Sequence, residues 1–159
     1  MKIKKIIVFA CILLFIFSAV CEPLIEEANL HLGKDYKYAT HGPNTFDCSG
    51  FTYYCYYTVY GIELSRSAKG QGYDEAYEKI ENIEDLKIGD IVCFNTVSDH
   101  DLSDHVGIYI GDGNFIHASS GKGEVCISTL LGGYYFEHFS WARRILKEEI
   151  PNETRPQSD

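Results

Sequence analysis

The stretch TFDCSGFTYYCYY, residues 45–57, contains two thiols in different settings. Cys48 follows Asp47, a good helix N-cap, and Gly61 is a good helix stop, so the residues between them are predicted to form a helix. Cys48 then lies in the first turn, where unpaired amides and the helix dipole stabilise a thiolate. Cys55 lies two turns further on among tyrosines and is interpreted as a small core residue. Cys48 is therefore the candidate nucleophile.

A thiol nucleophile needs a base, and His105 and His117 each lie in a strand-like run. With residues 111–113 as a three-residue hairpin loop, His117 lies opposite Gly107, so both histidines share one face as diagonal neighbours. A two-residue loop would place them on opposite faces. The shared face predicts a Cys–His–His triad in which His105 activates Cys48 and His117 fixes the orientation and tautomer of the His105 ring.

The other histidines are interpreted as structural. His100 is the one rival base, in the acidic segment SDHDLSDH at residues 98–105, which is interpreted as a solvated loop and not as a metal site. The chain has no CxxC pair and no Cys/His cluster with zinc-finger spacing, so no metal is predicted. No organic cofactor is expected for a thiol hydrolase. The histidines given a structural role are His31, His41 and His138.

The spacing of apolar residues changes along the chain from a helical period to a strand period, and this change predicts the elements that position the candidate site residues. Residues 22–32 and 47–60 are predicted helices, and residues 65–80 are a weaker one. From residue 89 onward, short β-branched or aromatic runs alternate with turn residues. Helices followed by strands describe an α+β domain with an antiparallel sheet. The five predicted strands lie in the runs GDIVCFN, HVGIYIG, NFIHAS, EVCIST and SWARRIL.

Both ends of the chain are predicted to lie outside the domain, which spans residues 22–150. Residues 1–21 have a basic start, an apolar run and small residues, the pattern of a secretory signal cleaved after Cys21. The alternative is an uncleaved membrane anchor, since the run approaches spanning length. Residues 151–159 have no apolar residue to bury and are predicted to be a disordered tail, with a glycosylation sequon at Asn152.

Charge excludes several classes of partner. Removal of residues 1–21 takes away three lysines and no acid, which leaves a net charge of about −12. Nucleic acid and anionic membranes require a basic surface, so neither is an expected partner, and no stable membrane association is expected after signal removal. The protein is expected to be a secreted monomer. Four cysteines remain after cleavage, which is sparse for a disulfide scaffold, and pairing of Cys93 with Cys126 stays open.

Residues 36–50, YKYATHGPNTFDCSG, resemble the stretch that opens the catalytic domain of the NlpC family of cell-wall cysteine peptidases. The resemblance continues in order through LSRSAKGQ (64–71), LKIGDIVCF (86–94), HVGIYIGDGNFIHAS (105–119) and ARRIL (142–146). It implies a papain-like fold with a five-stranded sheet. It also implies hydrolysis of peptidoglycan stem peptides or muropeptides, at the bond from the D-glutamate γ-carboxyl to diaminopimelate or lysine.

The resemblance also implies roles for individual residues. Cys48 matches the nucleophile, His105 the base and His117 the orienting residue. Tyr36 matches a tyrosine near the thiol and is a candidate oxyanion donor together with the Cys48 backbone amide. The residues implied to contact the free amine end of the stem peptide are Asp47, Ser49 and Arg66.

One departure from the family pattern is Tyr38-Ala39-Thr40, where the family has an aromatic residue followed by two glycines. It leaves the shape of that loop open. The alternative functions are an N-acyl amidase with the same Cys–His geometry, a catalytically idle wall-binding protein, and a disulfide-stapled interaction domain. A periplasmic or lysosome-like compartment is the alternative to secretion.

Overall fold

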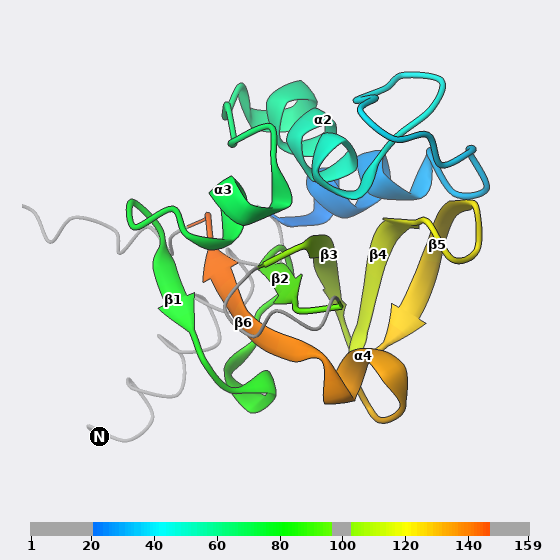
Figure 1. Cartoon of the computed structure of the whole chain (residues 1–159). Coiled ribbons are helices and arrows are strands. Elements are labelled where there is room, and N and C mark those ends of the chain that lie inside the picture. The colour runs from blue at the N-terminus through cyan, green and yellow to red at the C-terminus, as the bar shows by residue number, and fades with distance from the viewer. Residues whose placement is uncertain (1–20, 97–102, 147–159) are drawn as a thin grey trace, which may run out of the picture.

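The computed structural model describes residues 21–96 and 103–146 (Figure 1). The predicted signal over residues 1–21, except Cys21, lies outside the described residues, as do the tail over 151–159 and the sequon at Asn152. Within the described ranges, no helix combines the length and the apolar character needed to span a bilayer. After a helical segment over residues 21–29, the elements are α2 (Cys48–Tyr60), α3 (Ala68–Gly72), β1 (Glu78–Ile80), the 3-10 helix η1 (Ile83–Asp85), β2 (Ile91–Phe94), β3 (His105–Gly111), β4 (Asn114–Ser119), β5 (Glu124–Thr129), α4 (Tyr134–Glu137) and β6 (Phe139–Arg144).

The strands form one antiparallel sheet in the order β1-β6-β2-β3-β4-β5. The prediction of five strands is wrong by one, because residues 78–80 form β1 on the edge of the sheet. This strand lies inside the region predicted as a helix over residues 65–80, of which only residues 68–72 are α-helical. β1 has three residues and buries one of them, Ile80, so it is too short to show a strand period in the sequence.

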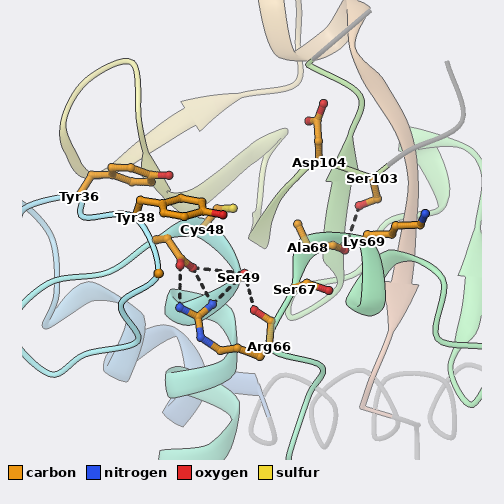
Figure 2. Close-up of a pocket in the computed structure, with 12 residues that line it drawn as sticks. Tyr36, Tyr38, Cys48, Ser49, Arg66, Ser67, Ala68, Lys69, Ser103 and Asp104 are labelled. Carbon is orange, nitrogen blue, oxygen red and sulfur yellow. Dashed lines mark hydrogen bonds and ion pairs between the residues drawn. The ribbon is translucent and has the colours of Figure 1, made fainter. Parts of the chain in front are cut away.

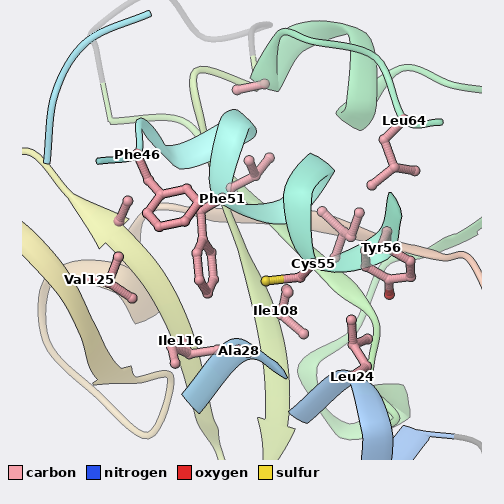
Figure 3. Packing of buried hydrophobic residues seen from close by; sticks show 14 of the residues in the cluster. Leu24, Ala28, Phe46, Phe51, Cys55, Tyr56, Leu64, Ile108, Ile116 and Val125 are labelled. Carbon is pink, nitrogen blue, oxygen red and sulfur yellow. The ribbon is translucent and has the colours of Figure 1, made fainter. Parts of the chain in front are cut away.

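Helix α2 forms where the sequence predicts it. The Asp47 side chain caps its N-terminus, and Gly61 ends it with a left-handed φ of 67°. Figure 3 shows the Cys55 sulfur pointing into the core between α2, the helical segment 21–29 and the sheet. Cys55 is fully buried, which confirms its interpretation as a core residue. The core on this side includes Leu24, Ala28, Phe46, Phe51, Cys55, Tyr56, Val106, Ile108, Ile116 and Val125.

A second apolar cluster lies on the opposite face of the sheet. Successive residues of a strand point to opposite faces, so Ile91 and Cys93 of β2 join the core under α2 while Val92 and Phe94 join the second cluster. The sheet is thus buried on both faces along its centre. The second cluster consists of Ile80, Val92, Phe94, Phe115, Leu130 and Ala142, with Tyr135 among the partly buried residues packed against it.

The β3–β4 hairpin reaches the predicted pairing by another route. Its turn is the two-residue pair 112–113, with φ values of 51° and 70°, as a type I′ turn requires. A bulge between Tyr109 and Gly111 supplies the extra residue, so Ile108 still pairs with Ile116. The three-residue loop is therefore wrong, whereas the predicted pairing beyond the bulge is confirmed.

Candidate active site

The Cys48 thiol lies at the N-terminus of α2, against the start of β3. Asp47 fixes this helix end, because its Oδ1 accepts a hydrogen bond of 2.7 Å from the Gly50 amide. The Cys48 sulfur is half-buried, and the backbone amides of Cys48, Ser49 and Val106 each favour its ionised form and so lower its pKa. Val106 directly follows His105, so the thiol lies against the residue next to the candidate base.

Burial dominates the ionisation of both groups. It raises the pKa of the Cys48 thiol to about 11, although the three amides act in the opposite direction. The expectation that the helix start lowers the net pKa of Cys48 is therefore wrong. Burial also lowers the pKa of His105 to about 4, partly opposed by Asp104. The resting site consequently holds a neutral thiol beside a neutral imidazole.

The two histidines are in direct contact. His105 Nε2 lies 2.7 Å from His117 Nδ1, with the ring planes at 86°. This confirms the prediction that they share one face of the hairpin, which is the face that also carries Phe94 and Phe115. Because Nε2 of His105 is engaged, its Nδ1 is the nitrogen left to take a proton from Cys48. Burial is the main cause that lowers the pKa of His117, to about 2.

A pocket of about 520 Å³ opens beside the thiol (Figure 2). Figure 2 shows Tyr36 and Tyr38 on one side of Cys48, and Lys69 and Ser103 on the other. Burial raises the pKa of Tyr36, with further contributions from Cys48 and Asp47, so its hydroxyl lies within electrostatic reach of the thiol. The residues that line the pocket are Tyr36, Tyr38, Ala39, Asp47, Cys48, Ser49, Arg66, Ser67, Ala68, Lys69, Ser103 and Asp104.

Asp47 and Arg66 form a two-pronged ion pair in the floor of this pocket. Arg66 donates to the two Asp47 carboxylate oxygens at 2.9 and 2.6 Å, and to Ser49 Oγ at 3.1 Å. The family resemblance implies that Asp47, Ser49 and Arg66 contact the same part of a substrate, and the structure brings the three together. The Asp47 carboxylate already has a cationic partner, so a substrate ammonium group would add to this network and not meet a lone acid.

The loop that departs from the family pattern keeps a glycine-like backbone. Ala39 has a φ of 61°, the left-handed region that favours glycine. The carbonyl of Thr40 accepts hydrogen bonds from the Asp47 amide at 2.9 Å and from Arg66 at 3.0 Å. A Cβ added to Gly50 would collide with that carbonyl. The loop thus packs directly on the first turn of α2 despite the alanine.

Two residues near the histidines were not predicted from the sequence. The Tyr135 ring stacks on His105 at 6.0 Å and meets His117 edge-on at 5.0 Å. Ser128 Oγ lies 3.0 Å from His117 Nε2. Tyr135 belongs to a four-residue helix without a pattern of its own, and the role of Ser128 depends on the β4–β5 register, which turn residues alone do not determine.

The remaining thiols and histidines lie away from this chemistry. His31 is buried and bridges Glu27 and Lys34 at 2.8 and 2.9 Å, in keeping with a structural role. Cys93 and Cys126 are free and lie on β2 and β5, three strand spacings or about 14 Å apart. That separation exceeds the reach of a disulfide. In the described part of the chain, no group of three or more His, Cys, Asp or Glu is arranged to hold a metal ion.

The profile of the NlpC/P60 family matches residues 33–144, a range that contains Cys48, His105 and His117. The chain belongs to the NlpC/P60 family. It is 34% identical over 131 residues to the probable endopeptidase YafL of Escherichia coli, covering 82% of this chain and 52% of YafL. It is 37% identical to the murein DD-endopeptidase MepH of E. coli, over 72% of this chain and 42% of MepH. It is 36% identical to the gamma-DL-glutamyl hydrolase of Bacillus subtilis, over 82% of this chain and 31% of that protein.

Solved structures of the family share the fold. An NlpC/P60 family protein from Bacillus cereus superposes with a TM-score of 0.71 at 33% identity, covering 80% of this chain and 40% of the other. NlpC1 from Trichomonas vaginalis gives 0.70 at 34% identity, covering 78% and 43%. The predicted papain-like α+β fold is confirmed. The chain spans about half or less of the length of the three curated relatives named above.

Proposed function

We propose that the protein is a cysteine peptidase that hydrolyses an amide bond in the stem peptide of peptidoglycan. The observation that carries the proposal is the 2.7 Å contact between His105, the first residue of β3, and His117 of β4, with Cys48 interacting with the backbone of Val106, the residue after His105. A nucleophile, a base within reach and a third group that orients the base form the recurring arrangement of acyl transfer. The names of the relatives, endopeptidases and a glutamyl hydrolase, support this class of substrate.

The proposed reaction has two halves. The Cys48 sulfur attacks the amide carbonyl while its proton passes to His105 Nδ1, and the carbonyl oxygen becomes an oxyanion. Candidate donors to that oxyanion are the Cys48 amide and the Tyr36 hydroxyl. His105 then protonates the leaving amine as the C–N bond breaks, which leaves a thioester on Cys48. Water, deprotonated by His105, hydrolyses the thioester and restores the thiol.

The bond we favour joins the D-glutamate γ-carboxyl to diaminopimelate or lysine. The Asp47–Arg66 end of the pocket would hold the amine end of the stem peptide, since the Asp47 carboxylate oxygens can accept hydrogen bonds from an ammonium group. The leaving diamino acid would then lie toward Lys69, whose exposed side chain lines the other end and suits a carboxylate. The relative MepH is named for DD-endopeptidase activity, so the bond has to be tested directly.

The test is digestion of purified muropeptides, with the products identified by mass spectrometry. We expect fragments cut after D-glutamate from the wild-type protein and no cleavage by Cys48→Ala. An amidase would instead release the whole stem peptide from the glycan, and a DD-endopeptidase would separate cross-linked dimers only. Wild-type protein that binds muropeptides without cutting them would contradict the proposal and favour the idle wall-binding alternative.

We also propose that the protein is exported and acts as a monomer outside the cytoplasm. The proposal rests on the basic and apolar pattern of residues 1–21. Cys21 is buried, and its thiol donates to the Ile88 carbonyl at 3.1 Å. Cleavage after Cys21 would remove this contact, whereas an earlier cleavage would keep it. N-terminal sequencing of secreted material distinguishes the two, and material that reads from Met1 would contradict cleavage.

A further inference from the structure

The ring nitrogen of His117 that faces away from His105, Nε2, contacts the side chain of Ser128. His117 is fully buried, and its Nε2 lies 3.0 Å from Ser128 Oγ and 3.6 Å from Cys126 Sγ. The β4–β5 register explains both contacts, because His117 pairs with Cys126. Ser128 is two residues further along β5 on the same face, which is the diagonal neighbour position. Both polar contacts of His117 with side chains of β5 are therefore built into the sheet.

Proton counting assigns a direction to these hydrogen bonds. When Cys48 gives its proton to His105, the imidazolium carries hydrogen on both ring nitrogens. His105 Nε2 then donates to His117 Nδ1, which must be unprotonated and accept. A neutral His117 therefore carries its own hydrogen on Nε2. That buried N–H needs an acceptor, and Ser128 Oγ is the nearer and stronger of the two on offer.

We propose that Ser128 is a positioning residue of this active site, which accepts the His117 Nε2 hydrogen and so holds the histidine pair in the tautomers that let His105 act as a base. The proposal rests on the proposed function only for its effect on turnover. Its effect on the Cys48 thiolate is independent of any substrate. Ser128 touches neither the thiol nor the substrate pocket and acts through His117 alone.

Other titratable groups around the pair do not replace this acceptor. Asp104 acts on His105 from the start of β3, and its carboxylate already accepts from the Thr96 amide and hydroxyl. The Lys122 cation acts on His117 from the β4–β5 turn and can only donate. Tyr135, from α4, meets the His117 ring edge-on. The Cys126 thiol, 3.6 Å from His117 Nε2, is a further titratable contact, and sulfur is a weak acceptor.

The experiment compares Ser128→Thr with Ser128→Val in the full protein. The two side chains have the same shape, and both suit a strand, but only threonine retains an acceptor oxygen. The rate of Cys48 alkylation by iodoacetamide is measured against pH, together with kcat and KM on muropeptides. We expect wild-type behaviour from Ser128→Thr. For Ser128→Val we expect a roughly tenfold lower alkylation rate near neutral pH and a similar fall in kcat, with little change in KM.

The pH dependence separates positioning from a merely structural role. The deficit of Ser128→Val should shrink as the pH rises from about 7 to about 10, because the thiol then ionises without help from His105. Equal alkylation rates for the threonine and valine variants near neutral pH would overturn the proposal, and so would a deficit that persists unchanged at high pH. Ser128→Ala, which cannot overfill the site, gives the same comparison if the valine variant folds poorly. Alkylation still decides the question if muropeptides are not cleaved.

Discussion

At the residue scale, both the Cys48 thiol and the His105 imidazole are neutral in the resting site. Burial raises the pKa of the Cys48 thiol and lowers the pKa of His105, so each shift disfavours a separated charge in the resting protein. A thiolate and an imidazolium formed together are mutually stabilised, which makes proton transfer within the pair the natural route to the nucleophile. The three amides at the Cys48 sulfur then favour the anion once it has formed.

Replacement of the catalytic pair is expected to be non-additive. Cys48→Ala and His105→Ala should each reduce muropeptide cleavage to near background, and the double variant should be hardly worse, because the two groups act as one unit. His117→Ala should cost less, since it acts through His105. Steady-state kinetics on each variant, with circular dichroism to confirm the fold, measures this. A Cys48→Ala protein that cuts at the wild-type rate would exclude the mechanism.

Alkylation should select Cys48 among the thiols that the structure describes. Cys48 is half-buried, whereas Cys21, Cys55, Cys93 and Cys126 are buried. Because its pKa is raised to about 11, the labelling rate of Cys48 should climb with pH from neutral toward about pH 10 and not level off near 7. Peptide mapping after timed exposure to iodoacetamide identifies the labelled residue. A plateau already below pH 7, or faster labelling of Cys55, would contradict this expectation.

The site residues that could be predicted from the sequence are those with an informative pattern in the residues next to them along the chain. Cys48 follows an N-cap aspartate, and the two histidines lie at a countable distance from a glycine turn. Ser128 and Tyr135 carry no such local mark, because their importance comes from strand pairing and ring packing. The pKa of Cys48 could not be predicted for a related reason, since the helix-start effect is local while burial depends on the whole fold.

At the element scale, the hairpin of β3 and β4 sets the distance between the two imidazoles. The chain tolerates a turn that differs from the predicted one because a bulge restores the pairing. What matters for the site is the position before Ile108. Because Ile108 pairs with Ile116, Gly107 lies opposite His117, and it has no side chain to come between the two imidazoles. A Cβ placed there would lie 2.7 Å from Phe115 Cδ2 and 3.0 Å from His117 Cβ.

Gly107→Ala is therefore expected to harm both stability and activity. Overfilling a tight site of this kind costs roughly 1–3 kcal/mol in the free energy of unfolding. Displacement of His117 should also lower kcat, with a smaller change in KM. Gly132→Ala is the matched control, because a Cβ there meets nothing within 4 Å. Urea unfolding and muropeptide kinetics on both variants test this, and equal behaviour of the two would show that the hairpin yields without cost.

The elements missed from the sequence are short. Helix α2 was predictable because its cap, its stop and its aromatic interior agree over 13 residues. β1 and α4 have three and four residues and depend on neighbours for their shape. β1 exists because Glu78 and Ile80 pair with Arg144 and Ala142 of β6, a contact more than 60 residues away along the chain. Local pattern cannot contain such information.

At the scale of the whole molecule, the two apolar clusters explain how the thiol is positioned and how the histidine pair is shielded from water. One cluster seats α2 and so positions Cys48, while the other surrounds the histidine pair on the opposite face of the sheet. The thiol and its candidate base thus come from different layers, and Cys48 approaches the start of β3 through the backbone of Val106. This arrangement buries both histidines, His105 at 9% exposure and His117 at 0%. Because these buried histidines resist protonation, the stability of the fold is expected to depend on pH.

Acid should therefore destabilise the folded protein well above the pKa values of its carboxylates. Both histidine pKa values are lowered in the fold, to about 4 and about 2, against an unfolded value near 6.5. Below about pH 6.5 the unfolded chain binds protons that the folded chain does not, so stability falls as pH falls toward 4. Each such histidine contributes at most about 1.4 kcal/mol per pH unit in that window.

His105→Gln isolates one histidine from the other titrating groups, because glutamine can still donate to His117 Nδ1 but takes up no proton. Urea midpoints of both proteins at pH 7, 6 and 5 give the slope of stability with pH. The variant should lose less stability on acidification, by up to about 1.4 kcal/mol per pH unit below pH 6.5. Parallel slopes would mean that His105 takes up its proton in the folded protein as readily as in the unfolded chain. The neutral resting pair would then be ruled out, and Cys48 would face an imidazolium at mildly acidic pH.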